Sequence, residues 1–263
     1  MSQRCWFTCD ARLRTCSVVS RILIVADIHA NLRALEAVIE AAGQMDEVWN
    51  LGDTVGYGPH PLEVCELLDQ MGPSVWLAGN HDLAATGDLP LRMFNDAAAT
   101  AARWSGDRLN GGWRERLRRL PTSLVNDEVT LVHGSLRDPI WEYVLSEESA
   151  AACLADSSTS LVLVGHSHVA LEAVQGATGA IRLAAAQPGA AVDVGENPIV
   201  INPGSVGQPR DGDARAAFAV LERDGQTTRL TFRRVPYDIK GTQHAMRQVG
   251  LPRSLIERLG VGR

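Results

Sequence analysis

Lysine is almost absent from this chain, because Lys240 is the only one and arginine supplies the other basic side chains. The 25 basic residues face 31 acidic ones, which leaves a formal net charge of −6. A protein that binds nucleic acid usually carries a basic field, and this chain has none. The arginine-rich stretches at 114–119 and 229–234 are therefore interpreted as solvated faces of helices and strands.

Long apolar runs are also missing. None approaches the roughly 18–20 residues that a membrane-spanning helix needs. The first 20 residues lack the continuous apolar core of a secretory signal, because Arg4, Asp10, Arg12 and Arg14 interrupt it. We therefore expect a cytoplasmic protein without a membrane partner. The sequence does not indicate its oligomeric state.

Cysteine is scarce, with five residues in 263. Cys65 and Cys153 fall in helical patterns and are expected to be buried packing residues. Cys5, Cys9 and Cys16 lie outside any periodic pattern, and their spacing lacks a fourth ligand for zinc or a common iron–sulfur cluster. A redox or metal-sensing role for these three is kept as a disfavoured alternative.

The chain has no compositional break that would separate two domains. We expect one folded domain at 21–263, preceded at 1–20 by an extension that is disordered or arises from a start codon assigned too early. Apolar runs at 21–27, 47–53 and 74–80 alternate with segments whose apolar residues have helical spacing. This order of strands and helices is typical of a parallel sheet. The segment 91–119 is expected to be helical, with a break at Gly111-Gly112.

The second half of the chain has a different pattern, with short runs typical of strands. A hairpin is expected at 169–184, and a second sheet, antiparallel or mixed, is expected to pack on the first. A helix is expected at 146–156. The other strands are expected at 123–125, 129–133, 161–165, 199–202, 217–221 and 229–233.

Polar side chains follow these strands at the point where each one ends. Ligand sites of open α/β sheets lie beyond the carboxyl ends of the strands, so these side chains are expected to converge. Carboxylates, an amide and imidazoles together suit divalent transition metals better than calcium. The motifs are Asp27-Ile28-His29, Gly52-Asp53, Asn80-His81-Asp82, His133-Gly134 and Gly165-His166-Ser167-His168.

This set of residues is what a two-metal hydrolase needs. A carboxylate can span two metals, which lower the pKa of a bridging water so that hydroxide can attack phosphorus. A histidine that binds no metal can protonate the leaving group. Each motif alone has an ordinary structural explanation as a turn or cap, but the order and placement of all five favour a metal site.

In these motifs the chain resembles the calcineurin-like metallophosphoesterase superfamily, from about residue 21 to residue 205. The resemblance implies a four-layer α/β/β/α sandwich of two mixed sheets, with a dinuclear metal site at the strand carboxyl ends. Two more segments resemble the small prokaryotic phosphodiesterase branch, Gly56-Tyr57-Gly58-Pro59 and Asn202-Pro203-Gly204-Ser205-Val206-Gly207-Gln208-Pro209.

The resemblance also implies roles for individual residues. His81 would contact phosphate and act as general acid, Asp82 would orient the His81 ring, and Asn202 with Gly204-Ser205 would shape the pocket wall. The first metal would be held by Asp27, His29, Asp53 and His168. The second metal would be held by Asp53, Asn80, His133 and His166.

One departure concerns the phosphate-binding arginine. Serine/threonine phosphatases and diadenosine tetraphosphate hydrolases of the superfamily carry Gly-Asp-x-Val-Asp-Arg-Gly, whereas this chain has Tyr57 at the arginine position. Protein phosphatase activity is therefore disfavoured. Tyr57 and Arg210 are candidate substrate-binding residues, with loop packing and a surface position as the alternatives. His60 is expected at the rim of the site or at a helix start, and His244 at the surface.

The expected activity is hydrolysis of a phosphate ester, favoured as a diester, by a metal-bridging hydroxide with His81 as general acid. The cofactors would be two divalent ions, Mn²⁺ before Fe, Zn, Ni or Mg, and the partner a small phosphoester. A phosphomonoesterase is the alternative, and a non-catalytic scaffold is less favoured because His81 and every inferred ligand are present. Cyclic nucleotides, nucleic-acid ends, phospholipid head groups and small phosphomonoesters remain open as substrates.

Overall fold

The computed structural model describes residues 19–195, 197–225 and 227–263. The predicted extension at 1–20 lies outside this range except for Val19 and Ser20, and so do Cys5, Cys9 and Cys16. The first strand begins at Ser20, one residue before the expected start. In the described part of the chain, no helix has both the length and the apolar character needed to span a bilayer.

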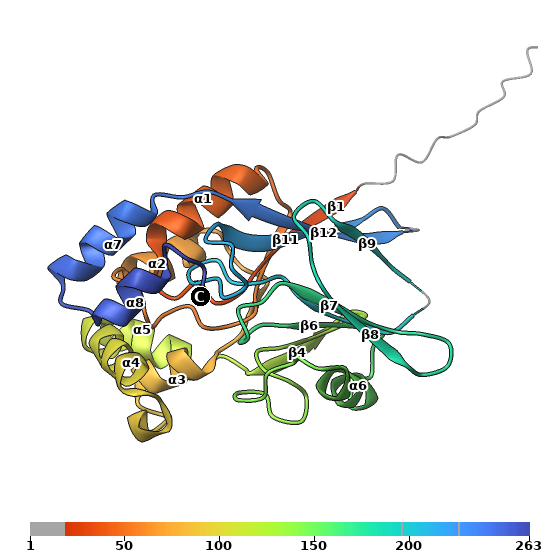
Figure 1. Ribbon diagram of the computed structural model, residues 1–263, viewed down its shortest axis with the longest axis horizontal. Coiled ribbons are helices and arrows are strands. Elements are labelled where there is room, and N and C mark those ends of the chain that lie inside the picture. The colour runs from red at the N-terminus through yellow and green to blue at the C-terminus, as the bar shows by residue number, and fades with distance from the viewer. Residues whose placement is uncertain (1–18, 196, 226) are drawn as a thin grey trace, which may run out of the picture.

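The first sheet has six strands and combines both halves of the chain (Figure 1). Its three N-terminal strands are parallel, as predicted, and the strands from the second half pair antiparallel. The strand order is β3 (Val75–Trp76), β2 (Glu47–Asn50), β1 (Ser20–Val25), β11 (Ala216–Arg223), β12 (Thr228–Val235) and β9 (Ala191–Val194).

The second sheet also has six strands, and it is mixed as predicted. The hairpin predicted at 169–184 is formed by β7 and β8, and it turns at Gly176 to Gly179. The strand order is β4 (Ser123–Asn126), β5 (Val129–Val132), β6 (Leu161–Val164), β10 (Ile199–Asn202), β7 (Leu171–Gln175) and β8 (Ile181–Ala185).

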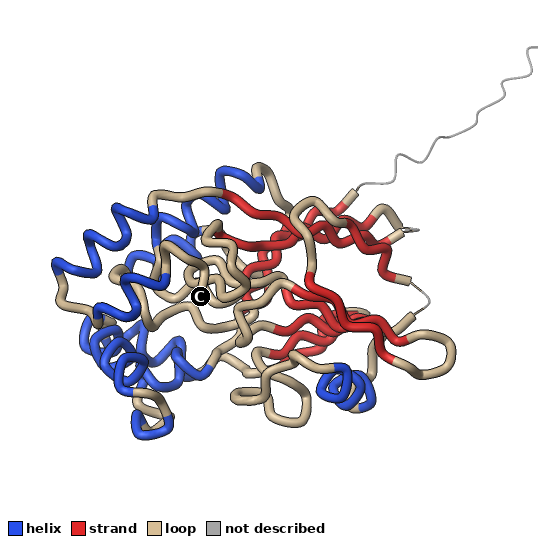
Figure 2. Tube along the Cα trace, viewed as in Figure 1, coloured by secondary structure: helices blue, strands red, loops and turns tan. Residues whose placement is uncertain are grey.

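The helices cover the outer faces of the two sheets and gather at one end of them (Figures 1 and 2). The predicted division of 91–119 into helical pieces is confirmed, but it falls at residues 109–110, just before the glycines: Asn110 caps α5, and Gly111 and Gly112 lie in its first turn. The helices are α1 (Leu32–Ala42), α2 (Pro61–Gln70), α3 (Asn80–Thr86), the 3-10 turn η1 (Leu91–Met93), α4 (Asp96–Arg108), α5 (Gly111–Arg118), α6 (Glu147–Ala155), α7 (Ile239–Gln248) and α8 (Arg253–Arg258).

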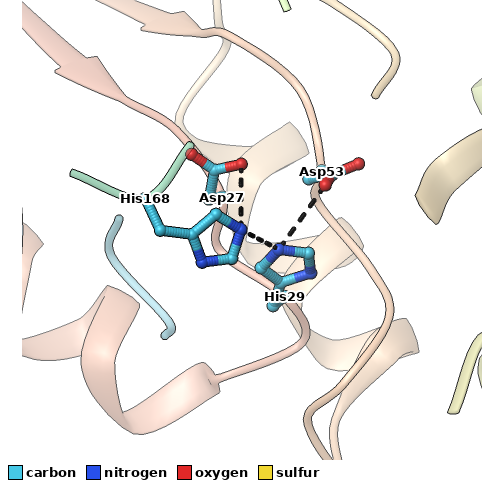
Figure 3. A group of neighbouring side chains, drawn as sticks. All are labelled: Asp27, His29, Asp53 and His168. Atoms are coloured by element: carbon cyan, nitrogen blue, oxygen red, sulfur yellow. Dashed lines mark hydrogen bonds and ion pairs between the residues drawn. The ribbon is translucent and has the colours of Figure 1, made fainter. Parts of the chain in front are cut away.

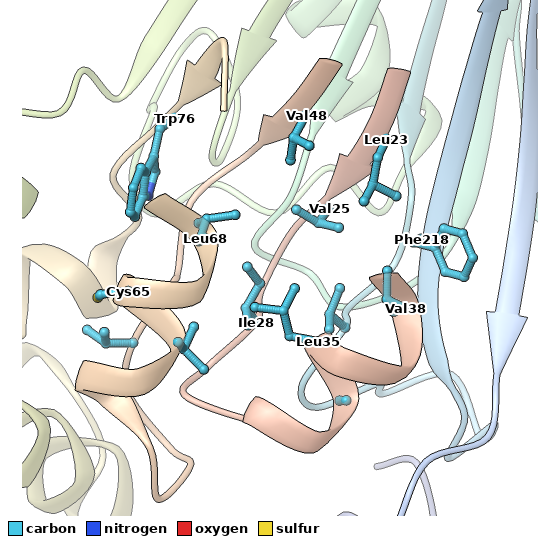
Figure 4. Close-up of a cluster of buried hydrophobic side chains, with 14 of the residues drawn as sticks. Leu23, Val25, Ile28, Leu35, Val38, Val48, Cys65, Leu68, Trp76 and Phe218 are labelled. Carbon is cyan, nitrogen blue, oxygen red and sulfur yellow. The ribbon is translucent and has the colours of Figure 1, made fainter. Parts of the chain in front are cut away.

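Side chains that alternate between the two faces of each sheet produce the predicted four layers. In β1, Ile22 and Ile24 point to the core between the sheets, whereas Leu23 and Val25 point to α1 and α2. Figure 4 shows this outer cluster, in which Cys65 is buried as expected. Cys153 is buried where α6 packs on the outer face of the second sheet. The architecture is therefore an α/β/β/α sandwich.

The carboxyl ends of the central strands of both sheets open toward the same end of the sandwich. Asp27 follows β1 and Asp53 follows β2 in the first sheet, while His133 follows β5 and His166 follows β6 in the second. Backbone hydrogen bonds join these strand ends, including Asp27 N–H to Gly52 O at 3.0 Å and Gly165 N–H to His133 O at 2.8 Å. The fold therefore places the polar motifs side by side.

Candidate metal centre and catalytic site

Two overlapping groups of side chains lie at these strand ends. The first group holds Asp27, His29, Asp53 and His168, with one candidate ligand atom of each residue within 4.8 Å of the others (Figure 3). The second group holds Asp53, His133 and His166 within the same distance. All are buried, and Asp53 is common to both groups.

Asn80 completes the second group. It is the first residue of α3, and its Oδ1 lies 3.3 Å from His133 Nε2. Asp53 Oδ2 lies 3.5 Å from Nε2 of both His29 and His133. The structure thus brings together all seven residues that the sequence proposes as ligands.

The backbone at these positions is unusual. Eight non-glycine residues of the described chain have positive φ, and five of them are proposed ligands, with φ between 49° and 64°. A non-glycine residue in the left-handed region costs on the order of 1–2 kcal/mol, and such strain clusters at functional sites. The five are Asp27, His29, Asp53, His166 and His168.

Three imidazoles are fixed by backbone carbonyls. Nδ1 of His29 lies 3.1 Å from Val55 O, Nδ1 of His133 lies 2.9 Å from Leu51 O, and Nδ1 of His168 contacts Gln208 O at 2.6 Å. A carbonyl oxygen only accepts, so each Nδ1 carries the proton. In the neutral form of each ring, the lone pair of Nε2 is therefore directed into the site, as in metal-binding histidines.

These lone pairs and carboxylates suit a cation. Nε2 of His29 and Nε2 of His168 lie 3.0 Å apart, and with both protons on Nδ1 neither nitrogen can donate to the other. Oδ2 of Asp27 and Oδ2 of Asp53 are buried without a hydrogen-bond partner among the described residues. Buried acceptors without donors are costly. A divalent transition metal would satisfy this mixed nitrogen and oxygen donor set.

Burial and mutual charge perturb the ionisation of the group. Burial raises the pKa of Asp27 to about 7. Burial alone would also raise the pKa of Asp53, but His133 and His81 outweigh it and hold that pKa well below its usual range. Burial opposes protonation of His133, yet the Asp53 carboxylate raises the pKa of His133 to about 9.

His81 sits between two aromatic rings beside the ligand groups. Its ring centroid lies 4.3 Å from that of Tyr57 and 5.2 Å from that of Phe94. The backbone N–H of His81 donates to Asp53 Oδ1 at 2.8 Å. The ring nitrogen Nδ1 is buried without a partner among the described residues. Burial lowers the pKa of the imidazole to about 4.

Asp82 does not contact the His81 ring, contrary to the prediction that it orients that ring. Its carboxylate accepts hydrogen bonds from the backbone N–H of Thr54, Val55 and Gly79, at 2.9 to 3.2 Å. It lies at the third position of α3, where a carboxylate binds free N–H groups of the helix start. Asp82 therefore holds the loop after Asp53 against α3.

Asn202 and Ser205 support the ligand loops from behind. Asn202 Nδ2 donates to Gly165 O at 2.6 Å and to Ser167 Oγ at 3.0 Å. Ser205 Oγ donates to Asp27 O at 2.8 Å. The sequence suggested that these residues shape the pocket wall; the structure shows that they bind the backbone on which His166, His168 and Asp27 are carried.

A cavity of about 140 Å³ opens beside these groups. Tyr57 and Arg210 line it, and an Arg210 guanidinium nitrogen donates to Tyr57 Oη at 3.2 Å. Sequence reasoning missed six other lining residues, Met93, Phe94, Asn95, Ala98, Trp141 and Tyr143. The available signal was the pair Trp141-x-Tyr143, two aromatic residues close together after a ligand-bearing strand end.

The two remaining histidines lie elsewhere. His60 is the N-cap residue of α2, in keeping with the helix-start alternative. His244 is exposed on α7. Both line a separate groove between α2, α4 and α7, away from the candidate metal centre.

The chain is similar to known phosphoesterases over most of its length. The model of the calcineurin-like phosphoesterase superfamily domain matches residues 21–226. A metallophosphoesterase from Sphaerobacter thermophilus has 43% sequence identity and a TM-score of 0.84, with 93% of this chain and 100% of that chain covered. An uncharacterised protein of Methanocaldococcus jannaschii is 32% identical over 94% of this chain and 100% of its own length.

A more limited match is to a symmetrical bis(5'-nucleosyl)-tetraphosphatase of Nitrosococcus oceani. It is 33% identical over 114 residues, which are 41% of this chain and 39% of the relative. The two-sheet architecture, the Asp/His clusters and the match across 21–226 agree with one another. The chain therefore belongs to the calcineurin-like phosphoesterase superfamily and is a phosphoric ester hydrolase.

Proposed function

We propose that the protein hydrolyses a phosphodiester with the help of two divalent metal ions. The observation that carries the proposal is the placement of Asp53, whose carboxylate belongs to both donor groups. One metal would be held by Asp27, His29, Asp53 and His168. The other would be held by Asp53, Asn80, His133 and His166. Mn²⁺ is the first ion to test, followed by Fe, Zn, Ni and Mg.

The metals, when bound, would supply Lewis acidity toward the phosphoryl oxygens and lower the pKa of water. The side chains around them position the ester and transfer the proton. His81 would donate a proton to the leaving oxygen as general acid. Burial lowers the pKa of its ring to about 4, and the negative charge of a bound phosphate ester would raise that pKa.

The charge of the cavity favours a diester over a monoester. Arg210 is the only arginine or lysine among the described residues that line it. A diester carries one negative charge at the phosphoryl group, whereas an ionised monoester carries two. Arg210 approaches Tyr57, the residue at the position of the phosphate-binding arginine in the tetraphosphatase motif. Beside the two metals, Arg210 would therefore supply, from a different loop, the one side-chain cation that faces the phosphoryl group, which matches the single negative charge of a diester.

The experiment is hydrolysis of bis(p-nitrophenyl) phosphate with added Mn²⁺, with p-nitrophenyl phosphate as the monoester comparison. His81→Ala should lower kcat by about 10²- to 10⁴-fold, the usual contribution of a general acid. Asp53→Asn should abolish activity because both metals lose a ligand. His244→Ala, on an exposed part of α7, is the matched control. Full activity in both site variants would refute the proposal.

A further inference from the structure

The cavity has an aromatic wall, defined here as Phe94, Trp141 and Tyr143, next to the metal-ligand groups. With Tyr57, these make four of only thirteen aromatic residues in the whole chain. Phe94 follows η1, whereas Trp141 and Tyr143 lie in the loop between β5 and α6. Two segments distant in sequence thus meet at one cavity, so contacts between sequence neighbours do not explain the grouping of these rings.

The wall runs from the proposed general acid to a proposed ligand. The Phe94 ring lies 5.2 Å from the His81 ring and 5.1 Å from the Trp141 ring, between centroids. The Tyr143 ring stacks on His166 at 4.3 Å, with 16° between the planes. A group esterified to a phosphate beside His81 would therefore meet Phe94 and Trp141 first.

Two of these rings lie outside the buried hydrophobic core. Trp141 and Tyr143 belong to none of the four buried hydrophobic clusters of the described chain. Tyr143 is 45% exposed and its neighbour in the cavity, Met93, is 51% exposed. Large apolar side chains gathered at a cavity without a core to fill are typical of a ligand-binding surface.

The size and charge of the cavity limit what could bind. An apolar cavity of about 150 Å³ holds one benzene molecule, and this cavity is of similar size, about 140 Å³. The phosphoryl group would take up part of that volume, so an attached ring would extend toward the exposed Tyr143 at the edge of the cavity. A polyphosphate would bring several more negative charges, and beside the two proposed metals Arg210 is the single cationic side chain among the described lining residues.

We propose that the aromatic wall binds a flat aromatic ring of the substrate, so that the preferred substrate is an aryl or nucleoside ester with a single phosphoryl group. The proposal rests on the proposed function, because it places the phosphoryl group beside His81 and Arg210. The ring would lie against Phe94 and Trp141, in the tilted or offset arrangements that aromatic pairs favour.

The test is calorimetric binding of two phosphonates that cannot be hydrolysed, phenylphosphonate and methylphosphonate, to the Mn²⁺-loaded protein. They share the phosphonate group and differ in the ring, so their affinity ratio reports the wall alone. The phenyl compound should bind about tenfold more tightly. Trp141→Leu, which keeps apolar bulk but removes the flat ring, should bring the ratio close to one.

Trp104→Leu is the matched control, because Trp104 lies on α4 in the groove between α2, α4 and α7. The ratio of phenylphosphonate to methylphosphonate affinity in this variant should equal that of the wild type. A ratio near one in the wild type, or an unchanged ratio in Trp141→Leu, overturns the proposal. Separate measurements of AMP and phenyl phosphate binding distinguish a nucleobase from a simple aryl group. The gain in affinity that either ring provides should disappear in Trp141→Leu.

The two proposals fail in different ways. Diester hydrolysis with no preference for phenylphosphonate would overturn the ring-binding wall and leave the proposed function intact. Ring-selective binding without hydrolysis of any ester would support the wall and overturn the proposed function. Rapid hydrolysis of diadenosine tetraphosphate in preference to simple diesters would overturn the single-phosphoryl part of the proposal.

Discussion

At the scale of single residues, the position of the His81 ring depends on a glycine. Gly56 has φ of +98°, and a Cβ built on it would lie 2.7 Å from His81 Nδ1. On the other side the ring contacts Phe94, so it has little room to move away. The proposed general acid is therefore held by the absence of a side chain at residue 56, and an alanine there tests that constraint.

We expect Gly56→Ala to reduce kcat by at least about tenfold, because displacement of a catalytic group by about 1 Å can cost 10²-fold. Gly87→Ala is the control: Gly87 has a similar φ of +89°, and nothing lies within 4 Å of a built Cβ. Both variants share a backbone cost on the order of 1–2 kcal/mol, measured by chemical denaturation. Equal kcat values in the two variants would show that the His81 ring tolerates displacement.

Single residues also show which contacts the local sequence pattern predicts and which it does not. The clustering of Asp27 with Asp53, and of His133 with His166, could be predicted, because each pair follows two neighbouring parallel strands of one sheet. The partners of Asp82 could not, because its carboxylate reaches a loop 27 and 28 residues earlier in the chain. Phe94 and Trp141 meet only because two loops fold toward each other, and no periodicity signals that contact.

At the scale of elements, the loop after β10 supports two separate ligand loops. Asn202 reaches the loop after β6, and Ser205 reaches the end of β1. Groups that orient metal ligands commonly change metal affinity 10- to 100-fold when removed. The Asn202 amide also accepts the Gly204 N–H at 2.8 Å, so one side chain links its own turn to the His166–His168 loop.

We therefore expect Asn202→Ala to weaken Mn²⁺ binding by roughly 10- to 100-fold in titration calorimetry. Asn110→Ala is a matched change, since Asn110 caps α5 through Trp113 N–H. It should cost about 1 kcal/mol of stability and leave Mn²⁺ affinity unchanged. Similar Mn²⁺ affinities in Asn202→Ala and the wild type would mean that this loop does not position the ligands.

Elements with strong periodicity were predictable, whereas pairings between distant segments were not. Strands such as β1 and β6 are continuous apolar runs and lie close to where the sequence places them. The second half was expected to form its own sheet, but β11 pairs with β1 and β9 extends that sheet. Partner choice depends on which edge of the first sheet is free, and alternation within one strand does not encode that.

At the scale of the whole molecule, the candidate centre joins the two sheets. Asp27 and Asp53 come from the first sheet, and His133, His166 and His168 come from strand ends of the second. Without cations, the carboxylates of Asp27 and Asp53 repel each other, which adds to the effect of burial in raising the pKa of Asp27. Bound metal would replace that repulsion with bonds that link the sheets.

Removal of metal should therefore destabilise the entire fold. Free Mn²⁺ at about 100 times its Kd should add about 2.7 kcal/mol to the free energy of unfolding, or roughly 5–10 °C in Tm for a chain of this size. EDTA should reverse the Mn²⁺-induced rise in Tm in the wild type and in His244→Ala. In Asp53→Asn, Mn²⁺ should raise the Tm hardly at all. Hydrogen exchange should slow on Mn²⁺ addition at the ends of both β1 and β6. Slowing in one sheet alone would contradict a centre that joins the two.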